Sequence, residues 1–247
     1  MKQIRKKIKI PKTDSIRVLA EFFDTHDSTD FEGELVEATH SVFAKRPTMI
    51  RAGKTKEIRW SNGSWLFIDI GFSNRRKSCG LLIHNEHPKC LHFNQACAAI
   101  LDYIAIAKRP INLVIEAPLS VAFDQSGNPT GRKIEKQRAE TRYWYVGAGC
   151  AMMVSAMYLV RSIDDAHPRH PVRLFEGFVS FKTAKSNDKH DVLRLREVVK
   201  NAEKNVDETV GPEELKLAPS DDVVSAFRVA GLDCGVPPVI MCKSQRH

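Results

Sequence analysis

From about residue 63 onward, apolar and polar positions follow the two spacings typical of strands and helices. Unbroken or alternating apolar runs predict strands at 64–72, 79–85, 90–93, 111–120 and 171–181. Apolar residues at helical spacing predict helices at 94–109, 133–162, 189–204 and 218–232. Strands that give way to alternating helices and strands predict an α/β domain over residues 63–247.

Residues 1–62 show no sustained periodicity. A basic start is followed by an acidic stretch at 22–40 and a second basic patch at 45–60. We expect an N-terminal appendage of hairpin or irregular structure that ends near residue 62. It is either a solvated extension or a basic arm that touches phosphates.

Charge adds a partner class to this picture. The chain has 247 residues, a formal net charge of +8 and basic clusters at 2–12, 45–59 and 132–142. This balance favours an anionic partner such as nucleic acid, although charge alone does not separate nucleic acid from an acidic protein.

Three features bear on the compartment. No apolar run approaches the roughly 18 residues that cross a bilayer. The basic opening lacks the apolar stretch of a secretory signal. The six cysteines form no CxxC pair, which is typical of reduced, buried thiols. We therefore expect a cytoplasmic protein without a membrane partner.

Two acids interrupt the most apolar predicted strands. Asp69 lies in "WLFIDIGF" and Glu116 in "INLVIEAPLS". If these strands lie side by side and parallel, the two carboxylates meet, and Asp221 or Asp222 at the start of the predicted helix 218–232 could add a third. Such a cluster needs cations, and hard oxygen ligands suit Mg²⁺ or Mn²⁺. The alternatives are acids at exposed strand ends or paired with arginine, and aspartates that only cap a helix.

Six segments in order carry a family resemblance: "FIDIGFS…KSCGLLI", "LVIEAPLS", "RAETRYWYVGAG", "RLFEGFVSFK", "KHDVLRLREVV" and "SDDVVSAFRVAGL". Together they resemble the predicted nucleases of the ribonuclease-H-like fold, relatives of the Holliday-junction resolvases. The resemblance covers about residues 63–235 and implies a mixed sheet flanked by helices. In that family the first strand carries a catalytic Asp, the fourth strand a second acid and the last helix a third.

Carried over to this chain, the resemblance implies that Asp69, Glu116 and Asp222 are catalytic metal ligands, with Asp221 as the alternative for the third. Glu176 in "RLFEGF" matches a recurrent family acid and is a weaker candidate. The chain departs from the family at Ser225, where the motif of the last helix has another acid. A hydroxyl can reach an ion or its water but brings no charge, so this departure predicts weaker metal binding and slow cleavage.

Two further groups of residues could bind ligands. Lys133, Lys136, Arg138 and Arg142 lie near Tyr143, Trp144 and Tyr145, and cations beside aromatic rings can hold phosphates and bases. Buried aromatic rings with exposed arginines explain the same pattern. The residues His84, His87, Cys90 and His92 have a composition that zinc could use, but they match no standard spacing, and a polar turn explains them equally well.

The leading interpretation is a metal-dependent nuclease that hydrolyses phosphodiester bonds of DNA or RNA through carboxylate-held metal ions. An alternative is a nucleic-acid-binding or assembly module of the same fold whose chemistry is weakened or lost, which Ser225 and the basic appendage favour. A third is a phosphotransferase of the actin-like and sugar-kinase type, because "DIGFSNRRKSCG" resembles their first phosphate loop. That class needs a second comparable domain, for which the chain lacks room.

Overall fold

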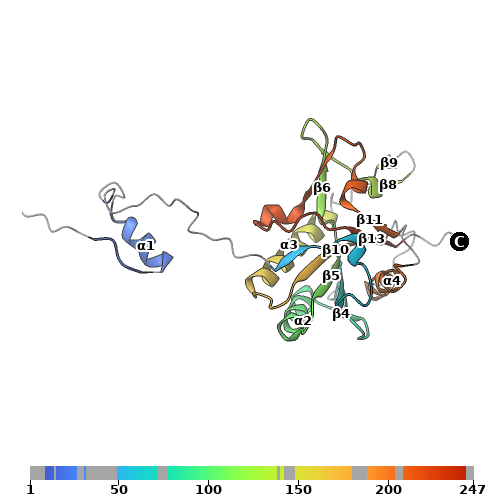
Figure 1. The fold of residues 1–247 in the computed structure, drawn as a ribbon, viewed down its shortest axis with the longest axis horizontal. Coiled ribbons are helices and arrows are strands. Elements are labelled where there is room, and N and C mark those ends of the chain that lie inside the picture. The colour runs from blue at the N-terminus through green and yellow to red at the C-terminus, as the bar shows by residue number, and fades with distance from the viewer. Residues whose placement is uncertain are drawn as a thin grey trace, which may run out of the picture. The chain divides into compact units, whose positions relative to one another are not determined.

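The computed structural model describes residues 9–13, 15–26, 31, 49–71, 77–137, 140–141, 148–179, 188–203 and 208–242. The chain divides into two compact units, residues 1–46 and 47–247 (Figure 1). In the first unit, helix α1 (Ile16–Phe23) ends in an aromatic group in which the rings of Phe22 and His26 stack 4.3 Å apart. Phe31 packs against the same rings and is buried.

The second unit is built on an eight-stranded sheet in the order β11-β13-β10-β5-β2-β3-β4, with β1 also paired to β10. Its strands are β1 (Ile50–Ala52), β2 (Ser64–Ile70), β3 (Cys79–Ile83), β4 (Lys89–Leu91), β5 (Ile111–Glu116), β10 (Val172–Val179), β11 (Thr209–Val210) and β13 (Val239–Cys242). Strands β2, β5, β10 and β13 run parallel, whereas β3, β4 and β11 pair antiparallel with their neighbours. The sheet is therefore mixed.

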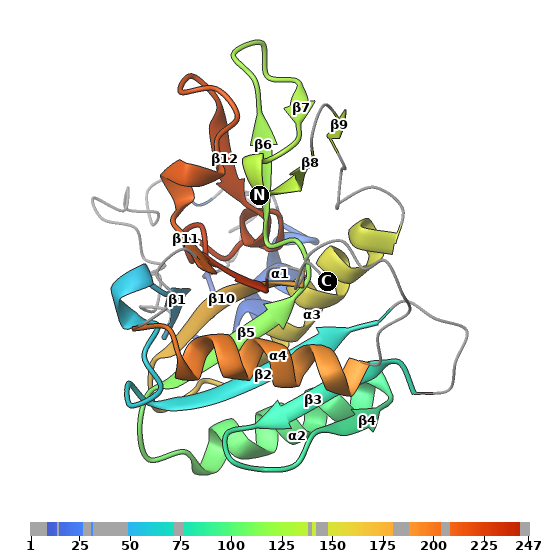
Figure 2. The ribbon, with the colours of Figure 1, turned by 90° about the vertical axis from the view of Figure 1, so that its right-hand side faces the viewer.

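Helices cover both faces of this sheet (Figure 2). Helices α2 (Phe93–Ile106) and α3 (Ala148–Asp165) bury one apolar stripe each against the face that includes Leu66, Ile68 and Ile115. Helix α4 (Asp188–Lys200) packs on the opposite face against Phe67 and Val114. Strands β2 and β5 are buried along their whole length because both faces are covered, which explains their continuous apolar runs.

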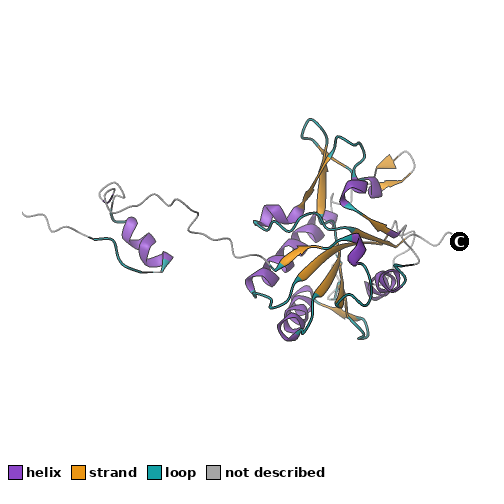
Figure 3. Ribbon diagram, viewed as in Figure 1, coloured by secondary structure: helices purple, strands orange, loops and turns teal. Residues whose placement is uncertain are grey.

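Smaller elements extend beyond the end of the large sheet at which β5 finishes (Figures 2 and 3). Strand β6 (Ser120–Phe123) follows β5 almost directly and forms a three-stranded sheet with β7 (Pro129–Thr130) and β12 (Asp222–Ser225). Strands β8 (Lys136–Gln137) and β9 (Glu140–Thr141) pair with each other. The described residues of this unit also form the short 3-10 helices η2 (Thr55–Glu57), η3 (Lys133–Glu135), η5 (Pro212–Leu215) and η6 (Ala226–Ala230).

The α/β class, the mixed sheet and its flanking helices confirm the sequence prediction at this level. All five predicted strands are present, as are the predicted helices at 94–109 and 189–204. Among the helices in the described part of the chain, none is both long enough and apolar enough to cross a membrane.

Three predicted boundaries are wrong. The helix predicted over 133–162 begins only at Ala148, since residues 133–137 form η3 and β8 instead. The helix predicted over 218–232 is replaced by strand β12 and the short helix η6, because residues 222–225 pair antiparallel with β6. Residues 50–52 pair with β10 and so belong to the large sheet, which means that the globular unit begins before residue 63.

Candidate metal centre

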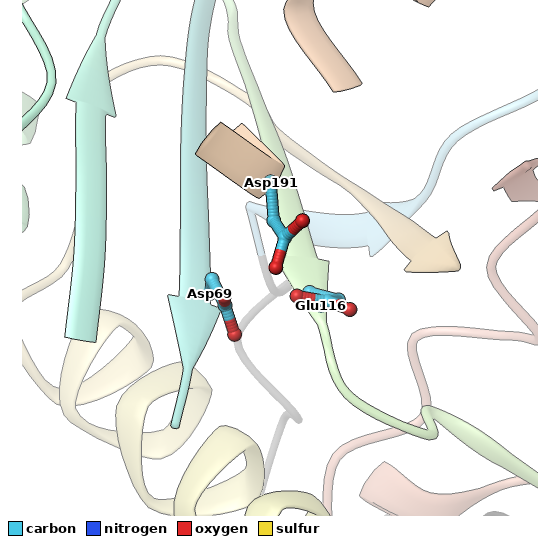
Figure 4. Close-up of side chains that lie close together, drawn as sticks. All are labelled: Asp69, Glu116 and Asp191. Carbon is cyan, nitrogen blue, oxygen red and sulfur yellow. The ribbon is translucent and has the colours of Figure 1, made fainter. Parts of the chain in front are cut away.

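Asp69 and Glu116 are direct neighbours across two parallel strands. Each is the partner of the other in the register of β2 and β5, and both side chains are buried, at 5% exposure. Figure 4 shows their carboxylates turned toward each other from the two strands. The predicted juxtaposition of these two acids is confirmed.

Side-chain alternation explains why both acids lie on the same face. In β2, Asp69 follows Phe67 by two residues, and in β5, Glu116 follows Val114 by two, so all four side chains lie on the face covered by α4. Asp69 is the penultimate residue of β2 and Glu116 is the last of β5. The apolar part of each strand thus supplies the core, and the acid comes where the strand finishes.

A third carboxylate comes from helix α4. Asp191 lies in its first turn and is completely buried. It is four residues before Leu195, whose side chain packs on the sheet, so both side chains lie on the inner face of the helix. The close approach of α4 depends on Gly177 in β10, where a Cβ atom would lie 2.9 Å from Cδ1 of Leu195.

The three acids converge on one point. Asp69, Glu116 and Asp191 each offer a carboxylate oxygen, and these oxygens all lie within 4.8 Å of one another. An octahedral Mg²⁺ holds its oxygens about 2.1 Å away, so two of its ligands lie at most about 4.2 Å apart. Among three ligands at most one pair can be opposite, and neighbouring ligands lie about 3 Å apart, so a bound ion would draw the carboxylates closer together by side-chain rotation. The donor set, three carboxylates without nitrogen or sulfur, fits a hard divalent cation such as Mg²⁺ or Mn²⁺.

The negative charges of this site also affect the pKa of the Cys242 thiol, at the end of β13. Burial raises its pKa to about 12; Arg194 opposes this rise, and the negative charges of Glu116 and Asp191 add to it. The thiol therefore stays protonated at neutral pH. It behaves as a small apolar side chain beside the acids, and the ligand set remains all-oxygen.

Asp221 and Asp222 lie apart from this cluster, which corrects the prediction that they supply the third carboxylate. Oδ2 of Asp221 accepts a hydrogen bond from the backbone N–H of Ala218 at 2.9 Å, and so closes a turn. Asp222 is an exposed residue of β12 that pairs with Phe123. The predicted helix that would have carried them to the site is absent, because this segment joins the small sheet.

Ser225 is likewise a structural residue and does not belong to the cluster. It is 3% exposed, pairs with Ser120 across β12 and β6, and accepts a hydrogen bond from the N–H of Phe227 at the start of η6. Its hydroxyl is an N-cap, which explains a serine at this position without reference to a metal.

Glu176 lies on β10 but on the other face of the sheet. It pairs with Ile115, whose side chain belongs to the core under α2 and α3, so alternation directs Glu176 away from the acid cluster. Its Oε2 accepts hydrogen bonds from Nη1 of Arg132 and from the N–H of Leu119, both at 2.8 Å. Arg132 is also fully buried and is paired with Glu135. Glu176 is thus part of a buried ion-pair network that anchors the chain after β5.

The predicted basic residues are only partly described. Lys133 is exposed at the start of η3, and Lys136 lies in β8. Arg138 and Arg142 lie outside the described residues. The zinc alternative for His84, His87, Cys90 and His92 gains no support, because among the described residues only Asp69, Glu116 and Asp191 gather as potential ligands. In place of a metal contact, Nε2 of His84 lies 3.0 Å from a guanidinium nitrogen of Arg109.

Asp191 is the site residue that the sequence analysis missed. An acid in an amphipathic helix normally belongs to the polar face, and Asp191 stands in "KHDVLRLREVV" between charged neighbours. The spacing of Asp191 indicates that it is buried. It lies four residues before Leu195 and eight before Val199, and both of these are buried on the inner face. An acid in phase with an apolar stripe marks a buried carboxylate.

The candidate site is therefore a buried trio of carboxylates from β2, β5 and α4 at the end of the sheet from which β6 emerges. Its chemistry is that of a hard-cation site. In comparisons with known proteins, no family model, no curated protein and no solved structure matches this chain.

Proposed function

We propose that this protein is a metal-dependent nuclease that hydrolyses phosphodiester bonds of DNA or RNA, with Asp69, Glu116 and Asp191 as its metal ligands. The observation that carries the proposal is the convergence of three buried carboxylate oxygens within 4.8 Å. Burying three like charges together is strongly unfavourable without a compensating cation. A divalent ion at this point would offset this repulsion.

The order of the acids along the chain supports a ribonuclease-H-like assignment. Counted from β2, the acids lie on the first strand, the fourth strand (β5) and the last α-helix (α4). This is the distribution that the family resemblance implies, with Asp191 in the place first given to Asp222. The resemblance and the geometry thus support the same three positions in the fold.

The chain's residues have separable roles in this proposal. Asp69 and Glu116 are held by paired strands and form a rigid base, while Asp191 closes the site from the helix above. A bound Mg²⁺ or Mn²⁺ would polarise a phosphodiester and favour ionisation of a water molecule. The net charge of +8 favours approach of a polyanion.

The test is cleavage of labelled single-stranded and duplex DNA and RNA in Mn²⁺ and in Mg²⁺. Asp69→Asn, Glu116→Gln and Asp191→Asn keep side-chain shape while removing charge, and each should reduce cleavage by about a hundredfold or more. Asp222→Asn is the matched control, because it makes the same change on exposed β12 and should cleave like wild type. Equal cleavage by Asp191→Asn and wild type would refute the assignment of the third ligand.

Metal binding provides a second readout that does not depend on finding the right substrate. Calorimetric titration with Mn²⁺ should show a binding isotherm for wild type and for Asp222→Asn, and none for Asp69→Asn. Absence of Mn²⁺ binding by wild type would exclude the proposed site. Mn²⁺ binding together with nucleic-acid binding but no cleavage of any strand would instead favour a binding module with lost chemistry.

A further inference from the structure

A second group of residues gathers at the opposite end of the same strands. Trp60, His84, Arg109 and Lys200, called here the Trp60 cluster, lie near the residues that begin β2 and β5. His84 directly follows β3, and its N–H donates to the carbonyl of Trp65 in β2. Lys200 is the last residue of α4, whereas Asp191 lies in its first turn.

The contacts within the Trp60 cluster are specific. The rings of Trp60 and His84 stack with centroids 5.1 Å apart and planes 12° from parallel. Nζ of Lys200 lies 5.3 Å from the centroid of the Trp60 ring. Arg109 contacts Nε2 of His84 at 3.0 Å through Nη2 and donates through Nε to Oγ of Ser64 at 3.1 Å. Two aromatic rings and two cations are thus joined in one group.

The charge of Arg109 is held by neutral partners. A guanidinium can only donate, so Nε2 of His84 accepts and the imidazole is neutral, with its proton on Nδ1. Burial and the nearby charge of Arg109 lower the pKa of His84, which keeps the ring neutral. No described carboxylate forms an ion pair with Arg109, and Lys200 has only a long contact of 3.7 Å with Glu197. The cluster therefore presents an oriented guanidinium on an exposed residue.

We propose that the Trp60 cluster binds single-stranded nucleic acid, with Arg109 and Lys200 as contacts to its phosphates beside the Trp60 ring. Cations interleaved with aromatic rings are the chemistry that recognises single strands, because phosphates and bases alternate along them. A guanidinium fixed by two acceptors is well suited to a phosphate oxygen. The assignment of nucleic acid as ligand rests on the proposed nuclease function.

The spacing between the two sites sets the length of a stacked strand that reaches both. Ser64, which anchors Arg109, lies five residues before Asp69 in β2, a distance of about 17 Å along the strand. At the rise of about 3.4 Å per stacked nucleotide, this separation corresponds to about five nucleotides. A stacked strand of about five nucleotides or more can therefore contact both sites.

The experiment measures binding of an end-labelled oligothymidylate of 15 nucleotides by fluorescence anisotropy in EDTA, where no cleavage occurs. Arg109→Gln should raise the Kd for the 15-mer about threefold, and Arg109→Gln with Lys200→Gln about tenfold. The slope of log K against log salt concentration is negative, and each lost phosphate contact should reduce its magnitude by about 0.7. Trp60→Leu should weaken binding without changing this slope, because the ring carries no charge.

Arg161→Gln is the matched control, since Arg161 is an exposed arginine of α3 paired with Asp165, and it should leave both Kd and slope unchanged. Circular dichroism checks that each variant is folded. Unchanged binding by the double variant overturns the proposal, as does a loss confined to duplex DNA. If the double variant binds like wild type and still cleaves normally in Mn²⁺, only the role of the Trp60 cluster is refuted. If the variants lose binding but the wild-type protein cleaves no strand, only the nuclease assignment is refuted.

Discussion

Gly177 of β10 lies directly beneath Leu195 of α4, so closely that a Cβ atom on the glycine would come within 2.9 Å of Cδ1 of the leucine. Leu195 is one helical turn from Asp191, so the distance between helix and sheet at this point also fixes the height of the third carboxylate. A change far from any ligand oxygen should therefore alter the metal site.

We expect Gly177→Val to lift the first half of α4 from the sheet. The overpacking should lower the free energy of unfolding by about 1–3 kcal/mol and weaken Mn²⁺ binding more than tenfold. Urea unfolding and calorimetric titration measure the two effects. Gly211→Ala is the control, because a Cβ there meets the flexible carboxylate of Glu214 at 3.3 Å and Cγ2 of Thr55 at an ordinary contact distance of 3.9 Å. Wild-type Mn²⁺ affinity in a folded Gly177→Val protein would contradict this coupling.

The ion-pair network of Arg132 should be important for stability rather than for metal binding. Glu176→Ala leaves the fully buried guanidinium with Glu135 as its only charged partner among the described residues, and removal of one partner from a buried pair costs about 3–5 kcal/mol. Glu176→Gln keeps an oxygen that can accept from Arg132 and Leu119, so it should lower the free energy of unfolding by less. Urea unfolding measures both, with the half-exposed Glu197→Ala as a control that should change stability by less than about 1 kcal/mol.

Acid should weaken the contacts that tie residues 50–57 to the sheet. The hydrogen bond from Arg51 lowers the pKa of Glu57, and Arg173 contributes to the same effect. A carboxyl whose pKa is depressed in the folded state stabilises the protein above its unfolded value, near 4.5, and loses this contribution as pH falls through the lower folded value. Glu57→Gln should therefore be less stable than wild type at pH 7 and lose less stability below pH 4.5.

Urea midpoints at pH 7, 5, 4 and 3 for wild type and Glu57→Gln measure this difference. The exposed Glu203→Gln, whose distance to Arg59 is 3.9 Å, is the control and should follow the wild-type curve. Parallel pH curves for Glu57→Gln and wild type would show that Glu57 is not responsible for the acid sensitivity.

The positions of Asp69 and Glu116 could be predicted from the sequence because each is the sole acid in a strand whose other residues are buried. Two continuously apolar strands favour the centre of a sheet, where both faces are covered. Asp191 could not be chosen from charge alone, since it differs from the exposed Glu197 of α4 only in its phase with Leu195 and Val199.

The segment around Ser225 shows why local signals led to the wrong element. Ser225 and Gly231 are indeed helix caps, as their residue types suggest, but they bound the short helix η6 and not a long one. The β-branched pair Val223 and Val224 extends along β6, so pairing with a distant strand overrides the helical spacing of the segment. The partner strand is about 100 residues away in the chain, and no local pattern reveals it.

This reassignment reverses the expected effect of an acid at position 225. If Ser225 stood at the metal site, Ser225→Asp would add a ligand and raise cleavage. Because Ser225 is buried at the junction of β12 and η6, the substitution should instead bury a charge next to Ser120 and lower the free energy of unfolding by about 1–3 kcal/mol. Ser225→Ala, which removes only the cap, should lower the free energy of unfolding by about 1 kcal/mol.

Neither substitution of Ser225 should change the Mn²⁺ affinity of the folded protein, measured by calorimetry, whereas Asp191→Asn should abolish Mn²⁺ binding with little loss of stability. Tighter Mn²⁺ binding by Ser225→Asp would return this residue to the site and contradict the assignment of Asp191.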